Sequence, residues 1–85
     1  MDKDLIISNL NKNSTEIIRV ALQSYLGSQF LSIRCFYDAD GGKGTRFLPT
    51  KKGLSIPLGL MEDLHKAVGK AIEALPGWSG EAKDE

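Results

Sequence analysis

The chain has 85 residues, of which 41% are hydrophobic and 26% charged, so we expect one small globular domain. A lone domain of this size buries only about 60% of its unfolded surface, and such domains often depend on disulfides, a metal or a partner copy. Cys35 is the single cysteine and His65 the single histidine, which excludes an intrachain disulfide and a Cys/His metal cluster. We therefore expect a compact core or a second copy, with no metal and no other cofactor.

The formal net charge is zero, but the charges are sorted along the chain. Residues 17–57 carry six Lys and Arg against two Asp, whereas residues 58–85 carry three Lys against six acidic residues. A basic middle segment can form an anion-binding face that the overall charge hides. Neither a secretory signal nor a membrane-spanning run is present, so a cytoplasmic location without membrane contact is expected.

The first half of the chain predicts a polar lead followed by a hairpin. Residues 1–15 are mainly polar with one apolar patch, Leu5 to Ile7, and are expected to form a flexible arm or a weak additional strand. Residues 17–25 and 29–38 follow the two-residue period of strands, and Leu26-Gly27-Ser28 between them predicts a turn. The two strands are expected to pair antiparallel.

A glycine-rich loop and two short strands are expected next. Residues 38–44 read Asp-Ala-Asp-Gly-Gly-Lys-Gly and predict a mobile loop. Strands are expected at 45–48 and 54–56, joined by a turn at 50–53 in which Gly53 can adopt positive φ. The loop lacks the ending and the following helix of a phosphate-binding loop, which argues against nucleotide hydrolysis.

The last part of the chain predicts one amphipathic helix. From Met61 to Leu75 the apolar residues recur every three or four positions, and Pro76-Gly77 ends the pattern. Gly69 costs about 1 kcal/mol relative to alanine in mid-helix, which close approach of a second helix would justify. Contacts between two helices of a homodimer are therefore expected from Met61, Leu64, Val68, Gly69 and Ile72.

These elements define an α+β domain, a curved four-stranded antiparallel sheet followed by one C-terminal helix. Its expected bounds are residues 16–76, between the flexible arm of residues 1–15 and an acidic tail of residues 77–85. The helix can cover one sheet face, so the apolar strand residues are expected beneath it. They are Ile18, Val20, Leu22, Leu31, Ile33, Cys35, Leu54 and Ile56.

The opposite sheet face combines arginine and aromatic side chains. Such a surface is typical of a platform on which unpaired bases stack, at about 1–3 kcal/mol per base. Lysines in the turns would follow the phosphate backbone along its rim. The aromatic rings could instead bury against a second copy or the N-terminal arm. No nucleophile with a base and no carboxylate pair is recognisable, so no enzymatic activity is expected.

Three local patterns follow one another in an informative order. The first strand ends in an aromatic, Tyr25, and the second contains Ile33-Arg34-Cys35-Phe36-Tyr37. Lys52-Gly53-Leu54-Ser55-Ile56 and a single long helix come next. Residues 16–75 thereby resemble the single-stranded-DNA-binding domain of the transcriptional coactivator family called positive cofactor four, in the form of a small bacterial member.

The resemblance implies a homodimer whose helices form the interface and whose sheets bind single-stranded or melted DNA with little sequence preference. It implies contacts from Tyr25, Arg34 and Lys52, with Tyr37 in place of a family tryptophan. The family's lysines after the first strand are absent. Together with the sheet-face pattern, the expected nucleic-acid contacts are Arg19, Tyr25, Phe30, Arg34, Phe36, Tyr37, Lys43, Arg46, Phe47, Lys51 and Lys52. Single-stranded RNA binding, or a dimeric protein-interaction module that uses the same face, is the alternative.

Overall fold

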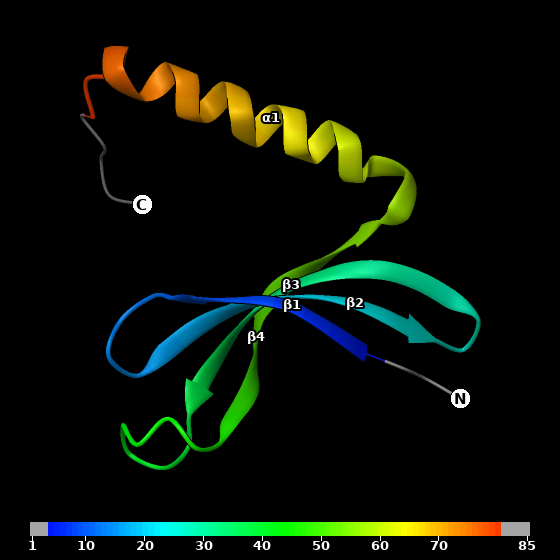
Figure 1. Ribbon diagram of the computed structural model, residues 1–85, viewed down its shortest axis with the longest axis vertical. Helices are drawn as coiled ribbons and strands as arrows, with labels where there is room; N and C mark the ends of the chain where they lie inside the picture. The colour runs from blue at the N-terminus through cyan, green and yellow to red at the C-terminus, as the bar shows by residue number, and fades with distance from the viewer. Residues whose placement is uncertain (1–3, 81–85) are drawn as a thin grey trace.

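The computed structural model describes residues 4–80, which form an open sheet and one long helix (Figure 1). The strands are β1 (Asp4–Asn11), β2 (Glu16–Tyr25), β3 (Ser28–Asp38) and β4 (Phe47–Pro57). The short 3-10 helix η1 (Leu58–Leu60) leads into α1 (Met61–Ala74), and a second one, η2 (Leu75–Gly77), follows it. The predicted α+β class, a four-stranded antiparallel sheet followed by one C-terminal helix, is confirmed.

Each strand pairs antiparallel with its neighbour in the sequence, so the sheet order is β1-β2-β3-β4. The hairpin between β2 and β3 closes through Leu26 and Gly27, which have positive φ values of 51° and 84°. Two consecutive residues with positive φ are typical of the two-residue turns that match the twist of paired strands. Glycine accepts this conformation freely, whereas a leucine rarely adopts it.

One expectation about the strands is decided by the structure and a second is wrong. Residues 4–11 form β1, so of the two alternatives for this segment the additional strand is confirmed rather than the flexible arm. The segments 45–48 and 54–56 are not two strands joined by a turn, because β4 runs through both. The residues that suggested a turn form a bulge in β4. Arg34 pairs with Gly53 and Phe36 with Pro49, so residues 50–52 lie opposite Cys35 alone.

Gly53 is required for a reason other than the predicted turn. Its φ is not positive, but a Cβ at this position would lie 2.8 Å from the carbonyl oxygen of Ile33 and 2.9 Å from Cα and Cβ of Arg34. No side chain fits at such distances. The glycine therefore allows β4 to approach β3 closely beside Arg34.

Strand register sorts the side chains onto two faces of the sheet. We call the first the apolar face, because its rows across the strands consist almost entirely of hydrophobic residues. Its members are Leu5, Leu10, Ile18, Val20, Leu22, Leu31, Ile33, Cys35, Leu54 and Ile56. The prediction that the apolar residues of the strands share one face is therefore confirmed.

The helix does not cover the apolar face of its own chain. No residue of α1 is buried, and its main contacts are with η1 and η2 at its ends. Figure 1 shows α1 as a rod that stands apart from the sheet. The expected packing of this helix on this sheet is wrong, because the three residues of η1 lead directly into α1 without a loop that would turn it back.

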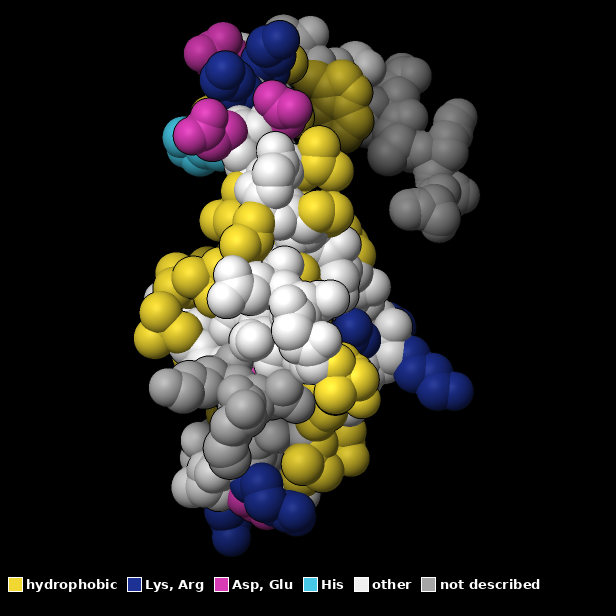
Figure 2. Space-filling view, turned by 90° about the vertical axis from the view of Figure 1, so that its right-hand side faces the viewer, with side chains coloured by type: hydrophobic (Ala, Val, Ile, Leu, Met, Phe, Trp, Pro, Cys, Tyr) yellow, Lys and Arg dark blue, Asp and Glu magenta, His cyan; other side chains and the backbone are white. Residues whose placement is uncertain are grey.

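Two apolar surfaces consequently remain open in the single chain. Leu54 on the sheet is 53% exposed, and Val68 and Ile72 on the helix are 50% and 60% exposed. Hydrophobic side chains are visible on both the helix and the sheet in Figure 2. The radius of gyration is 15.3 Å, against about 12 Å for a compact domain of this length. The single chain is thus less compact than its length allows.

Candidate nucleic-acid interface

The second face of the sheet, which we call the arginine face, carries the predicted basic and aromatic side chains. Strand register arranges it in four rows that cross the sheet. The rows are Asp4-Gln23-Phe30-Pro57, Ile6-Ala21-Ser32-Ser55, Asn9-Arg19-Arg34-Gly53 and Asn11-Ile17-Phe36-Pro49. A row that begins with the polar Asp4 and Gln23, a floor of mostly small residues, an arginine row and a row that contains Phe36 therefore follow one another along the strands.

Arg19 is held in place from two sides. Its Cζ lies 4.4 Å from the centroid of the Phe36 ring, well within the range of a cation–π contact. Its Nε donates a hydrogen bond of 2.9 Å to Oδ1 of Asn9 on β1. The guanidinium is therefore fixed over an aromatic ring by side chains of two neighbouring strands, and its terminal N–H groups are further hydrogen-bond donors.

Arg34 is tied to the bulge of β4. Its Nη1 donates a hydrogen bond of 2.9 Å to the carbonyl oxygen of Thr50. The hydroxyl of Thr50 donates to the carbonyl oxygen of Cys35 at 2.8 Å and accepts from the backbone N–H of Lys52 at 3.1 Å. These bonds fix the bulge, from which the exposed residues Lys51 and Lys52 project.

The two arginines are direct cross-strand partners. Like charges in this position repel each other. Within residues 4–80 the ion pairs are Lys12–Glu16 and Arg46–Asp40, so no carboxylate compensates either arginine. Two uncompensated guanidiniums side by side form a site that favours an anion, and their planar forks suit phosphate oxygens.

A hollow of about 370 Å³ lies on the arginine face. It is lined by Asp4, Ile6, Arg19, Ala21, Gln23, Ser32, Arg34, Phe36 and Pro49. Ala21 and Ser32 are 4% and 6% exposed, so the bottom of the hollow consists of small side chains beneath larger neighbours. The hollow therefore combines cations, an aromatic ring and a polar edge within one surface.

The structure brings only some of the predicted site residues to this hollow. Arg19, Arg34 and Phe36 line it, and Phe30 lies on the same face in the row of Asp4 and Gln23. Tyr25 ends β2 on the same side by strand alternation and is 59% exposed.

Phe47 and Tyr37 lie elsewhere on the sheet. Phe47 pairs with Asp38 at the opposite end of the arginine face. Tyr37 pairs with Glu16 and Leu48. Since it follows Phe36 on the same strand, its side chain lies on the opposite, apolar side of the sheet. The structure therefore does not bring Tyr37 together with the arginines.

Two further predicted contacts lie in the loop between β3 and β4. The carboxylate of Asp38 accepts hydrogen bonds from the backbone N–H groups of Asp40 at 2.8 Å and Gly44 at 2.7 Å, which shapes the loop. Arg46 forms an ion pair of 3.4 Å with Asp40, so part of its charge is already compensated. Lys43 is exposed in the same loop.

Sequence reasoning missed Asp4, Asn9 and Thr50. The register of β1 shifts between Ile6 and Ser8, so Asn9 rather than Ser8 shares a face with Ile6. A bulge of this kind breaks strict alternation and hides the strand pattern. Allowing one inserted residue in the segment 4–11 would have placed both β1 residues on the arginine face.

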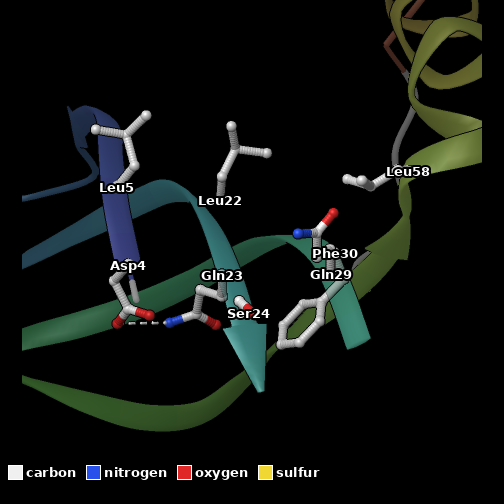
Figure 3. Close-up of a pocket in the computed structure, with 8 residues that line it drawn as sticks. All are labelled: Asp4, Leu5, Leu22, Gln23, Ser24, Gln29, Phe30 and Leu58. Carbon is white, nitrogen blue, oxygen red and sulfur yellow. Dashed lines mark hydrogen bonds between the residues drawn. The ribbon is translucent and has the colours of Figure 1, made fainter. Parts of the chain in front are cut away.

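A second hollow, of about 440 Å³, opens near the start of β1 (Figure 3). Leu5 and Leu22 point to the side of the sheet on which α1 lies, whereas Asp4, Gln23 and Phe30 point to the other side. Leu58 of η1 also lines this hollow. Its leucines continue the apolar face toward the helix, whereas Asp4 and Gln23 belong to the arginine face.

Glu16 forms a small polar cluster at the far end of the apolar face. It accepts hydrogen bonds from Asn13 at 2.8 Å and from the Cys35 thiol at 3.4 Å, and it pairs with Lys12 at 3.5 Å. The bonds from Asn13 and Cys35, together with the charge of Lys12, lower the pKa of Glu16 below its usual value. The cluster fastens β2 to β3 and to the turn before β2.

Neither a metal centre nor a membrane helix is found in the described part of the chain. Among residues 4–80 no group of three or more His, Cys, Asp or Glu side chains is placed to hold a metal ion. In the same range no helix is long and apolar enough to cross a membrane.

Comparison with known proteins defines the class to which this sheet and helix belong. Residues 12–67 match the family described as Transcriptional Coactivator p15 (PC4). Because the match covers more than half of the chain, the protein belongs to this family of DNA-binding transcriptional coactivators. β1 lies outside the matched residues.

Solved structures agree with this assignment. The chain is similar to a PC4 homolog from Burkholderia pseudomallei K96243, known in two crystal forms. The orthorhombic form has a TM-score of 0.72 at 25% identity and covers 84% of this chain and 92% of that chain. The tetragonal form has a TM-score of 0.69 at 27% identity and covers 81% of this chain and 97% of that chain. No curated protein matches the chain significantly.

Proposed function

We propose that the protein is a non-enzymatic homodimer that binds single-stranded DNA in transcription regulation or a related DNA transaction. The observation that carries the proposal is the uncompensated pair Arg19 and Arg34 beside Phe36 on an open sheet face. Guanidinium groups bind phosphates, and aromatic rings accept unstacked bases regardless of their sequence. Membership in a family of DNA-binding coactivators supports the same reading.

The proposal favours a single strand over a duplex. Bases within a duplex are stacked on one another and cannot reach Phe30 or Phe36 on the face of a sheet. A single strand can splay its bases onto these rings while its phosphates contact the arginines and the exposed lysines of the β4 bulge. The contacts that we assign to the strand are Arg19, Tyr25, Phe30, Arg34, Phe36, Lys43, Arg46, Phe47, Lys51 and Lys52.

The open apolar surfaces support the proposed homodimer. Within residues 4–80, nothing covers the apolar face or the apolar stripe of α1, which includes Met61, Leu64, Val68 and Ile72. A Cβ at Gly69 would meet nothing within 4 Å in the described part of the chain, and close approach of a second helix would explain the glycine. A second copy supplies matching apolar surfaces through a two-fold interface.

Fluorescence anisotropy tests the proposed ligand. A labelled oligo-dT of about 20 nucleotides is compared with a duplex of equal length and with oligo-U, at low and moderate salt. We expect tight binding of oligo-dT that weakens with salt, and much weaker binding of the duplex. Preference for oligo-U would indicate an RNA ligand. Absence of binding to all three at low salt would contradict the proposal and favour a protein-interaction module.

A further inference from the structure

Asp4 is an unexpected residue on a surface that binds a polyanion. It begins β1 in the same row as Gln23, and it lines the hollow that Arg19 and Arg34 also line. A carboxylate in this place repels the phosphate backbone and lowers affinity for every strand, unless it makes a contact of its own. Its hydrogen bond from Gln23, 3.1 Å at an exposed site, contributes little to stability.

The hollow has two polar ends. Gln23 lies four positions after Arg19 on β2, a distance of about 13 Å along a strand. The nearly buried side chains of Ala21 and Ser32 form the floor between them. Its volume of about 370 Å³ falls at the lower end of the usual range for small-ligand sites. A nucleotide has the same polarity, with an anionic phosphate at one end and the hydrogen-bonding edge of a base at the other.

The chemistry of the Asp4–Gln23 pair selects among the bases. The carboxylate only accepts hydrogen bonds, whereas the Gln23 amide, which donates one N–H to Asp4, retains a second N–H to donate. Guanine presents two adjacent donors, N1–H and N2–H, next to the acceptor O6. Thymine presents one donor between two carbonyl oxygens, and adenine and cytosine each present one donor group beside an acceptor. Only guanine can donate twice to the carboxylate while its O6 accepts from the amide.

We propose that the hollow on the arginine face is a subsite for one nucleotide, in which Asp4 and Gln23 select guanine while Arg19 and Arg34 hold the phosphate. The inference rests on the proposed function and deepens it. The arginines and the aromatic rings of this face bind any single strand, and Asp4 and Gln23 add a preference at one position. The protein would then bind guanine-containing stretches of a single strand more tightly than other stretches.

The test compares a labelled 20-nucleotide oligo-dT with the same strand carrying one central guanine, adenine, cytosine or inosine. We expect the guanine strand to bind at least about fivefold more tightly than oligo-dT, the lower end of discrimination by one bidentate contact. Inosine lacks the N2 amino group and should lose most of the gain. Equal binding of all five strands would overturn the inference while leaving the proposed function intact, whereas absence of any binding would remove both.

Two variants separate recognition from simple charge. Asp4→Asn should bind oligo-dT at least as well as the wild type and should lose the preference for guanine. Asp63→Asn, in the first turn of α1, removes the same charge away from the sheet and should keep the preference. A uniform loss of affinity for all strands in Asp4→Asn would mean that Asp4 only fastens β1 to β2, and would overturn the inference.

Discussion

The two faces of the sheet are built from alternating residues of the same strands, yet they differ in nearly every property. On β2, Val20 and Leu22 belong to the apolar face, while Arg19 and Gln23 belong to the arginine face. The apolar face has no charged residue in its central rows, and α1 does not cover it. The second carries two arginines without a neutralising carboxylate among the described residues. Strand alternation thus gives one thin sheet two surfaces, one suited to a second copy and one to a polyanion.

Register maintains this separation. The shift at Ile7 in β1 keeps Ile6 and Asn9 on one side and Leu5 and Ser8 on the other. Without the bulge, the second half of β1 would present its side chains to the wrong faces. The Arg19–Asn9 hydrogen bond therefore depends on an irregularity in the strand.

The largest expected effect concerns α1, whose apolar stripe we propose as part of the dimer interface. Ile72→Asp should raise the dimer dissociation constant on the order of a hundredfold, because an unpaired charge would be buried in the interface. Sedimentation equilibrium measures the change. Lys70→Asp, on the opposite side of α1, is the matched control and should leave the dimer intact. A dimer that tolerates Ile72→Asp would exclude this stripe from the interface.

Adjacent residues on β3 test the difference between the faces directly. Phe36→Leu should weaken oligo-dT binding about tenfold, because it removes both a stacking surface and the ring beneath Arg19. Tyr37→Leu, one residue along and on the other face, should change oligo-dT affinity by less than about twofold. Equal losses in anisotropy titrations of the two variants would contradict the assignment of faces.

The charge of Arg34 should appear in the salt dependence of binding. Arg34→Ala should weaken binding to all single strands and reduce the slope of log affinity against log salt by about 0.7 to 1, as expected for one lost phosphate contact. Arg34→Lys should retain most of the slope because it keeps the charge. A slope unchanged in Arg34→Ala would mean that this residue serves only to hold the bulge at Thr50.

Gly69→Ala should change dimer stability in opposite directions, depending on whether Gly69 permits close approach of a partner helix or has no such role. Alanine favours the helix by about 1 kcal/mol, and no atom of residues 4–80 obstructs its Cβ. If a partner helix approaches closely at this point, the added methyl group should nevertheless weaken the dimer several-fold. Sedimentation of the variant at a series of concentrations distinguishes the two, and a strengthened dimer would show that no close approach exists.

The smallest effect is expected from pH. The pKa of Glu16 is lower in the folded chain than in the unfolded chain, so its charged form stabilises the fold at pH values above the unfolded pKa. That contribution is lost as pH falls through the folded pKa. The difference in Tm between the wild type and Glu16→Gln should therefore shrink from pH 7 to pH 3. A constant difference would mean that the hydrogen bonds of Glu16 do not depend on its charge.

Local patterns predicted the parts of the fold that depend on one element at a time. The alternation of β2 and β3 placed Arg19, Phe30, Arg34 and Phe36 on one face, and the apolar period predicted α1. The bulge in β4 was missed because Pro49, Lys51 and Gly53 suggest a turn, whereas the bonds of Thr50 keep the strand continuous. The position of the helix could not be predicted either, since its apolar period suggests packing on the sheet, whereas no residue of α1 is buried among residues 4–80.

The central claim is that the two faces bind different partners, and methyl NMR tests it most directly. Ala21 and Ile6 place methyl groups on the arginine face, and Val20 and Ile33 place them on the apolar face of the same strands. Titration with oligo-dT should shift the signals of Ala21 and Ile6 and leave those of Val20 and Ile33 nearly unchanged. Shifts confined to Val20 and Ile33 would contradict the account, because the strand would then lie on the face that we assign to the second copy.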